Sequence, residues 1–199
     1  LPPCRGETKL QLADMLGIAA GMLHDRKSLD LLFAVAEMRE SKGAEEIAAL
    51  EEAFDIGYRM HTTAMRLTRA GRGEHEIAGA VDGVAMSYGT GVSFSTILSQ
   101  HGEVLHNHDH TGILEDGRLL LCDAGGEHLN NYVSDHTRTF PVSGRFTQKQ
   151  KDIYNIVLAA HDKAEAALHA DMMYSEYSDA AFRTIIEGLR DLGLVRGSV

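Results

Sequence analysis

Positive charge is scarce in this 199-residue sequence: 19 lysines and arginines stand against 29 aspartates and glutamates, so the net charge is −10. Surfaces that bind nucleic acid usually carry a basic patch. We therefore expect no nucleic-acid partner. Hydrophobic residues make up 44% of the chain and charged residues 24%, which is the balance of an ordinary globular domain.

Long apolar runs and a leader pattern are also missing. No stretch approaches the roughly 18 residues that a membrane-spanning helix needs, and the first residues lack a basic segment followed by an apolar core. We expect neither a membrane span nor a signal peptide. Cysteine is equally scarce, since Cys4 and Cys122 are the only two. Both are predicted to be reduced and non-catalytic, which suits a cytoplasmic protein.

Helical periodicity is well represented. From Ala44 onward, apolar residues recur at steps of three and four, which predicts a helix with a buried stripe. The stripe consists of Ile47, Leu50, Phe54, Tyr58, Met65 and Leu67. His61, in the same segment, is interpreted as a packing or surface residue.

The same pattern predicts three further helices, over 74–87, 147–168 and 175–192. Near the start of the chain, the run from Leu29 to Val35 is apolar but short, which is compatible with a strand. A charged, glycine-containing link follows it and is a candidate boundary between two parts of the chain.

Two acidic residues, Asp123 and Asp135, lie in a hairpin pattern. Asp123 ends an apolar run that begins at Leu119, and Asp135 precedes a β-prone run that ends at Phe140. A hairpin centred on Leu129 would place the two aspartates directly opposite each other, with Cβ atoms about 4.5–5.5 Å apart. Two carboxylates at that distance repel unless one is protonated or a cation lies between them. A divalent metal ion, or a pair of them, is the simplest cation; the competing interpretation is a turn cap and a solvated edge residue.

Three alternating histidines, His106, His108 and His110, form a second group of candidate ligands. On a strand their side chains would share one face, a spacing that can chelate a metal. The competing interpretation is a polar rim in which only one histidine has a role. The residues alone leave both interpretations open.

The segments around the aspartates resemble a known family. DAGGE at 123–127 and SDHTRTFPVSGRFTQKQKDIYNIVLAA at 134–160 are similar to the catalytic domain of metallopeptidases that include Xaa-Pro aminopeptidases, prolidases and methionine aminopeptidases. The similarity is strongest to the Xaa-Pro branch. It implies an α+β pita-bread fold, a curved antiparallel sheet with helices outside. It also implies two divalent metal ions held by Asp123 and Asp135, with Mn²⁺ expected and Co²⁺ or Zn²⁺ as alternatives.

The resemblance further implies a function: hydrolysis of the peptide bond before proline, in a peptide or dipeptide substrate, by a homodimeric enzyme of the aminopeptidase P or prolidase type. His106 matches the family histidine that lies beside the metals and contacts substrate, so it is the expected catalytic residue among the three. Asn107 stands where the family usually has a tyrosine. His136 stands where the family usually has an apolar residue, and we expect it to be a packing or surface residue.

The family site also uses a later histidine and two glutamates, yet no histidine follows His169. We therefore expect a pita-bread domain that is incomplete at its C-terminal end and inactive as this chain alone. Residues 1–41 would be the tail of an N-terminal domain plus linker, and residues 42–199 the first part of the catalytic domain. The alternatives are a peptide- or protein-binding module without catalysis and a metal-free creatinase-like hydrolase, both of which usually lack the aspartate pair.

Overall fold

The computed structural model describes residues 5–197, so Cys4 lies outside the described residues. The chain forms two compact units, one comprising the described residues up to Glu51 and the other those from Glu52 onward. Within the described range, no helix combines the length and apolar character needed to cross a membrane.

The N-terminal unit is helical. Its α1 ends at Gly17, which adopts φ 62° and donates its N–H to the carbonyls of Ala13 and Asp14. Ser28 starts α2, because its hydroxyl accepts a hydrogen bond from the N–H of Leu31 at 3.1 Å. The strand expected over Leu29 to Val35 is therefore wrong, since this cap favours a helix over the same residues. The elements are α1 (Gly6–Leu16), two 3-10 turns (Ala20–Met22 and His24–Arg26) and α2 (Leu29–Glu40).

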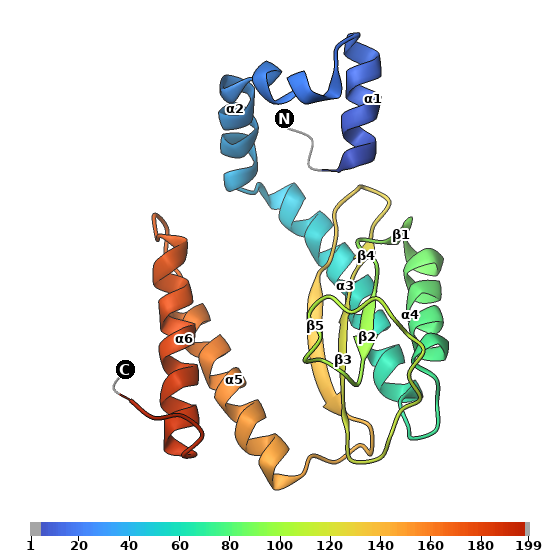
Figure 1. The fold of residues 1–199 in the computed structure, drawn as a ribbon, viewed down its shortest axis with the longest axis vertical. Helices are drawn as coiled ribbons and strands as arrows, with labels where there is room; N and C mark the ends of the chain where they lie inside the picture. Colours follow the sequence, from blue (N-terminus) through green and yellow to red (C-terminus); the bar gives the residue numbers. More distant parts are fainter. Residues whose placement is uncertain (1–4, 198–199) are drawn as a thin grey trace. The chain divides into compact units, whose positions relative to one another are not determined.

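The second unit combines helices with two small antiparallel sheets (Figure 1). One sheet has the order β2-β3-β5, and the other pairs β1 with β4. Its helices are α3 (Ala44–Leu67, from Glu52 onward in this unit), α4 (Glu74–Tyr88), α5 (Gln148–Ala167) and α6 (Tyr174–Asp191). Its strands are β1 (Gly91–Val92), β2 (Ile97–Ser99), β3 (Leu119–Ala124), β4 (Gly126–Glu127) and β5 (His136–Pro141).

The larger sheet has two chemically different faces. The even-numbered residues of β3, Leu120, Cys122 and Ala124, are fully buried in the core that α3 and α4 share with the sheet. The odd-numbered residues are half-buried and form the opposite face. Cys122 is a free cysteine, and burial raises the pKa of its thiol to about 12. This agrees with the prediction that Cys122 is reduced and non-catalytic.

The buried side of α3 differs from the predicted stripe. Phe54 and Tyr58 are 38% and 65% exposed, so their assignment to the core is wrong. The buried residues of α3 in this unit are mostly smaller and lie on a neighbouring face of the helix. They are Ala53, Ile56, Gly57, Met60, His61 and Ala64. A Cβ added at Gly57 would lie 2.8 Å from the Ser134 hydroxyl. The helix therefore approaches the sheet through small side chains, which periodicity of large apolar residues does not detect.

The other predicted helices are present. In α4, Ile77 and Val81 are fully buried. Thr147 and Gln150 form the capping box that starts α5. The helices α5 and α6 lie side by side (Figure 1), with Ile156 of α5 against Gly188 of α6.

Candidate functional site

A cavity of about 140 Å³ lies on the odd-numbered face of the sheet. Ile97, Asp123 and Thr137 line it from three adjacent strands, because the registers pair Ile97 with Asp123 and Asp123 with Thr137. Ser99 and Leu121 add to this strand wall, and the loop over residues 101–107 supplies the other lining residues, including His106. Asp123 and His106, predicted separately from the sequence, therefore line one cavity.

The hairpin register differs from the predicted one. Asp123 lies opposite Thr137, and the Thr137 hydroxyl donates a hydrogen bond to the Asp123 carboxylate at 2.8 Å. The expectation that Asp123 and Asp135 lie directly opposite each other is therefore wrong. Asp135 is exposed and stands one residue before β5, two positions from Thr137.

The hairpin tip explains this register. The His128 N–H bonds to the Tyr132 carbonyl, the Asn131 N–H bonds to the His128 carbonyl, and Asn131 has φ 65°. A turn followed by a left-handed residue is a common three-residue hairpin loop. The hairpin is therefore centred on Asn130, and each residue of β3 faces a partner two positions later than expected.

This register changes the electrostatic argument for a metal. Asp123 and Asp135 become diagonal neighbours, for which sheet geometry gives a separation of about 7–8 Å in place of 4.5–5.5 Å. Repulsion between carboxylates falls with distance, so the backbone no longer requires a cation between them. The support for a metal must come from the donor atoms.

The donor atoms suit a hard divalent ion. Among the residues that the structure describes, the ion pairs include neither Asp123 nor Asp135, so no basic side chain neutralises either carboxylate there. Carboxylate oxygens are ligands that Mn²⁺ and similar ions prefer. Asp123 lines the cavity, whereas Asp135 lies one residue before β5 and does not line it. The pair is therefore compatible with a metal site that needs further ligands.

The segment that contains the three histidines is a loop, so the predicted strand is wrong. His106 has φ 53°, a left-handed conformation that is uncommon for a non-glycine residue and is often found at functional sites. His108 is exposed, and His110 is half-buried with an unpartnered Nε2. The three side chains do not share a strand face, which removes the basis for a three-histidine chelate.

Glu74, which the sequence analysis missed, fastens both ends of this loop. Its side chain is 2% exposed, and Oε1 accepts hydrogen bonds from the Gln100 N–H at 2.7 Å and the Ser99 hydroxyl at 3.2 Å. At the other end, the Glu74 N–H donates to the Gly112 carbonyl at 2.9 Å. The Ser99 hydroxyl also accepts from the Asn107 side chain at 3.4 Å. From sequence, Glu74 resembled an ordinary acidic residue in a first helical turn.

His61 and His136 pack against neighbouring side chains, as predicted. The His61 Nε2 lies 3.2 Å from the Ala124 carbonyl, and its ring centroid is 6.3 Å from that of His136. The His136 ring also meets Phe54 at 5.3 Å. Burial lowers the pKa of both histidines, and for His136 the nearby Arg138 charge lowers it further. Both side chains therefore favour the neutral form.

A second cavity, of about 350 Å³, lies beside α3. Its lining residues are Phe54, Tyr58, His61, Thr62, Met65, His136 and Arg138. This set contains a guanidinium group and no carboxylate, so it does not suit a divalent cation. The smaller cavity, with Asp123, is the better candidate despite its size.

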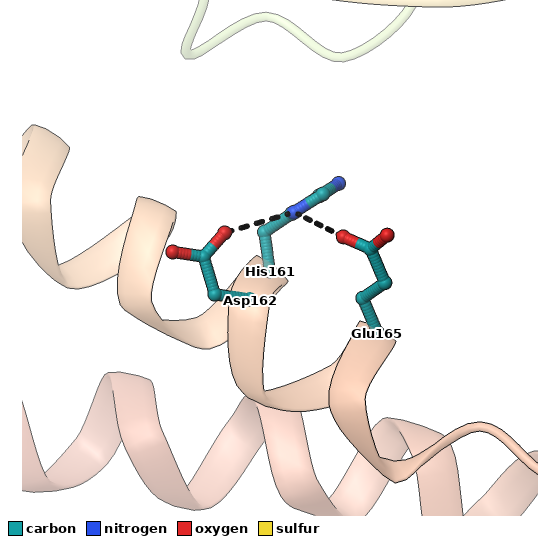
Figure 2. Close-up of side chains that lie close together, drawn as sticks. All are labelled: His161, Asp162 and Glu165. Carbon is teal, nitrogen blue, oxygen red and sulfur yellow. Dashed lines mark ion pairs between the residues drawn. The ribbon is translucent and has the colours of Figure 1, made fainter.

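Among the described residues, only one group of three potential ligands lies close together: His161, Asp162 and Glu165 on α5 (Figure 2). The His161 Nδ1 lies 3.5 Å from Asp162 and 3.9 Å from Glu165. All three side chains are at least 66% exposed. Water and salt compete strongly for such groups, and exposed pairs contribute little energy. We interpret the cluster as a solvated ion-pair network.

Comparison with known proteins gives a consistent picture. Residues 48–197 match the metallopeptidase family M24. The Xaa-Pro aminopeptidase of Escherichia coli is 36% identical over 168 residues, which are 83% of this chain and 38% of that relative. The Xaa-Pro aminopeptidase 2 of Streptomyces coelicolor is 31% identical over 183 residues, or 90% of this chain and 39% of the relative.

Solved structures show the same similarity. A substituted form of Escherichia coli aminopeptidase P superposes with a TM-score of 0.76 at 35% identity, covering 83% of this chain and 38% of that one. Proline aminopeptidase P II from Yersinia pestis gives a TM-score of 0.74 at 36% identity, covering 81% and 38%. These matches confirm the predicted α+β pita-bread fold. The chain spans about 38% of the length of these relatives.

Proposed function

This chain belongs to the metallopeptidase family M24, and from that premise we propose that the complete protein carrying it is an Xaa-Pro peptidase of the aminopeptidase P or prolidase type. It would hydrolyse the peptide bond before proline. The observation that carries the proposal is the convergence of Asp123 and His106 on one cavity, in a chain whose relatives are Xaa-Pro aminopeptidases.

Asp123 and Asp135 would hold two divalent metal ions, with Mn²⁺ the first choice and Co²⁺ or Zn²⁺ as alternatives. When bound, such ions lower the pKa of a water molecule and polarise the scissile carbonyl. Two carboxylates leave most coordination positions to other ligands, for which the family pattern expects a histidine and two glutamates. On this proposal, residues 1–199 alone are inactive.

His106 would contact the substrate and stabilise the oxyanion that develops at the scissile carbonyl. Its imidazole can donate a hydrogen bond, and a donor preorganised at that position is worth a large factor in rate. Its place on the cavity lining, next to Asn107, puts it within reach of a ligand on the odd-numbered face of the sheet.

The substrate is a peptide or dipeptide with proline at the second position, and the strand wall of Ile97 and Leu121 gives the cavity an apolar side suited to such a ring. We further propose a cytoplasmic homodimer. The net charge of −10 supports the expectation that nucleic acid and anionic membrane surfaces are not partners.

The test is a peptidase assay on the complete protein, purified with Mn²⁺. A tripeptide with proline second and an Xaa-Pro dipeptide are the substrates, and the same peptides with alanine second are the controls. We expect cleavage before proline that stops with a chelator and returns with Mn²⁺. Replacement of Asp135 by Asn should abolish turnover and weaken metal binding without unfolding, because Asn keeps the size and the acceptor oxygen. Normal turnover by that variant would show that Asp135 is not a ligand.

A further inference from the structure

Ser93 and Ser134 lie on the two backbone segments that flank Gly125. On one side, the Ser93 N–H donates to the Gly125 carbonyl at 2.9 Å, which continues the pairing of β1 with β4. On the other side, the Ser134 N–H donates to the Gly126 carbonyl at 3.0 Å, which continues the hairpin register beyond β3 and β5. Ser93 and Ser134 are far apart in the sequence, and they lie on either side of Gly125.

A hydrogen bond between the two serines passes over this glycine. The Ser93 hydroxyl donates to the Ser134 carbonyl at 2.7 Å. A Cβ added at Gly125 would lie 1.8 Å from that carbonyl oxygen and 2.6 Å from the Ser93 hydroxyl. Any side chain at position 125 would occupy the space through which the bond runs, so the bond requires glycine there.

The Ser134 carbonyl can accept this bond because the Ser134 hydroxyl takes its place as the acceptor in the strand pairing. In a hydrogen-bonded antiparallel pair, two residues exchange both N–H and carbonyl groups. Here the Gly126 N–H donates to the Ser134 hydroxyl at 3.0 Å. The carbonyl of Ser134 is thus turned toward Ser93 instead of toward Gly126.

This arrangement bears directly on Asp135, since the peptide that joins Ser134 to Asp135 is a rigid plane. The direction of the Ser134 carbonyl therefore sets the direction in which the Asp135 backbone leaves it. Local departures from regular pairing are a known means of re-aiming a side chain beside a functional site. Ser134 is fully buried, so its groups are held by protein partners and not by bulk water.

We propose that Ser93 and Ser134 are positioning residues for the metal ligand Asp135, with Gly125 as the gap that lets them meet. The inference rests on the proposed function in one respect, namely that Asp135 holds a metal ion. It goes beyond that function because it assigns roles to three residues outside the ligand set. It also gives a physical reason for the first glycine of the Asp-Ala-Gly-Gly segment.

An ordinary structural role would predict a different result. If the two hydroxyls only satisfied buried backbone groups, their removal would lower stability and leave metal affinity unchanged. If they aim Asp135, their removal weakens metal binding by more than any loss of stability explains. Partners that orient metal ligands typically change metal affinity by about 10- to 100-fold when removed.

The experiment measures the Mn²⁺ dissociation constant of the complete protein by electron paramagnetic resonance of the free ion, together with the thermal midpoint of the metal-free protein. Ser93→Ala should weaken Mn²⁺ binding about 10- to 100-fold. Ser93→Thr keeps the hydroxyl and should bind Mn²⁺ within about threefold of the unmodified protein. The matched control is Ser87→Ala on α4, where the lost hydroxyl also donates to a backbone carbonyl, that of Gly83, at 2.7 Å. It should leave affinity unchanged.

Ser134→Ala provides a second route if Ser93→Ala fails to fold, because the Ser134 carbonyl can then return to the Gly126 N–H. It should weaken Mn²⁺ binding to the same extent. Unchanged affinity in both alanine variants overturns the inference. An unmodified protein that binds Mn²⁺ but cleaves no Xaa-Pro peptide overturns the proposed function and leaves this inference to be decided by the affinities. An unmodified protein that binds no Mn²⁺ overturns both.

Discussion

Thr137 faces Asp123 across β3 and β5, and its hydroxyl donates to the Asp123 carboxylate at 2.8 Å. The hydrogen bond fixes one oxygen of a carboxylate that the hairpin register alone would leave free to rotate. It occupies only part of the acceptor capacity of that group, so the carboxylate can still coordinate a cation. Thr137 is therefore placed to orient Asp123.

Replacement of Thr137 by Val keeps the shape of the side chain and removes the donor. We expect Mn²⁺ affinity of the complete protein to fall about tenfold, the lower end of the range for partners that orient metal ligands. Thr137→Ser keeps the hydroxyl and is the control. Equal affinities for the Val and Ser variants, measured by titration with Mn²⁺, would contradict this role.

His106→Ala tests the only predicted catalytic histidine. In the complete enzyme, kcat on an Xaa-Pro peptide should fall about 10²- to 10³-fold, the cost of losing one oxyanion-stabilising donor. Metal content should not change, because the role proposed for His106 is substrate contact and not metal ligation. The control is His108→Ala, since His108 lies in the same loop but does not line the cavity. Loss of metal from His106→Ala would instead identify a ligand.

Ile56 and Ile47 test the corrected buried face of α3. Ile56 is 3% exposed, whereas Ile47 on the same helix is 52% exposed. Ile56→Ala should lower the free energy of unfolding by about 2–5 kcal/mol, because it leaves a cavity in the core. Ile47→Ala should change it by no more than about 0.5 kcal/mol. Urea denaturation followed by circular dichroism measures both. Similar losses of unfolding free energy in the two variants would support the buried stripe predicted from sequence.

His61 should make stability depend on pH. Burial lowers its pKa in the folded protein, so the unfolded chain, with a pKa of about 6.5, binds protons first as the pH falls. The contribution of neutral His61 to the free energy of unfolding is fully present above that pH. Below it the free energy of unfolding decreases, by at most about 1.4 kcal/mol per pH unit for one group. Urea midpoints at pH 7.5 and 5.5 should therefore differ less in His61→Gln than in the unmodified protein. An identical difference would show that His61 does not contribute.

Some features of the site follow from sequence because they are local. The start of the helix predicted over 147–168 was correct, since its capping box joins Thr147 and Gln150 within one helical turn. The family match likewise depends on contiguous residues, so the segments around Asp123 and Asp135 were enough to indicate the fold. The prediction that Cys122 is reduced and non-catalytic agrees with its being a free, buried cysteine.

Other features depend on how distant segments meet. The loop conformation of His106 is held in part by Glu74, which lies more than 30 positions earlier and gave no distinctive local signal. The buried face of α3 consists of small residues that become important only against the sheet. Neither relation is encoded in the spacing of neighbouring residues.

The sequence by itself determined the family, because the family pattern is written in residue types and their order, and it predicted two aspartates and a histidine as site residues. The tertiary structure decided the rest of the site. One left-handed residue, Asn131, centred the hairpin on Asn130 and placed Thr137, not Asp135, opposite Asp123. One missing side chain, at Gly125, lets Ser93 reach Ser134. Strand pairing and backbone approach are long-range relations, and they exist only after the chain has folded.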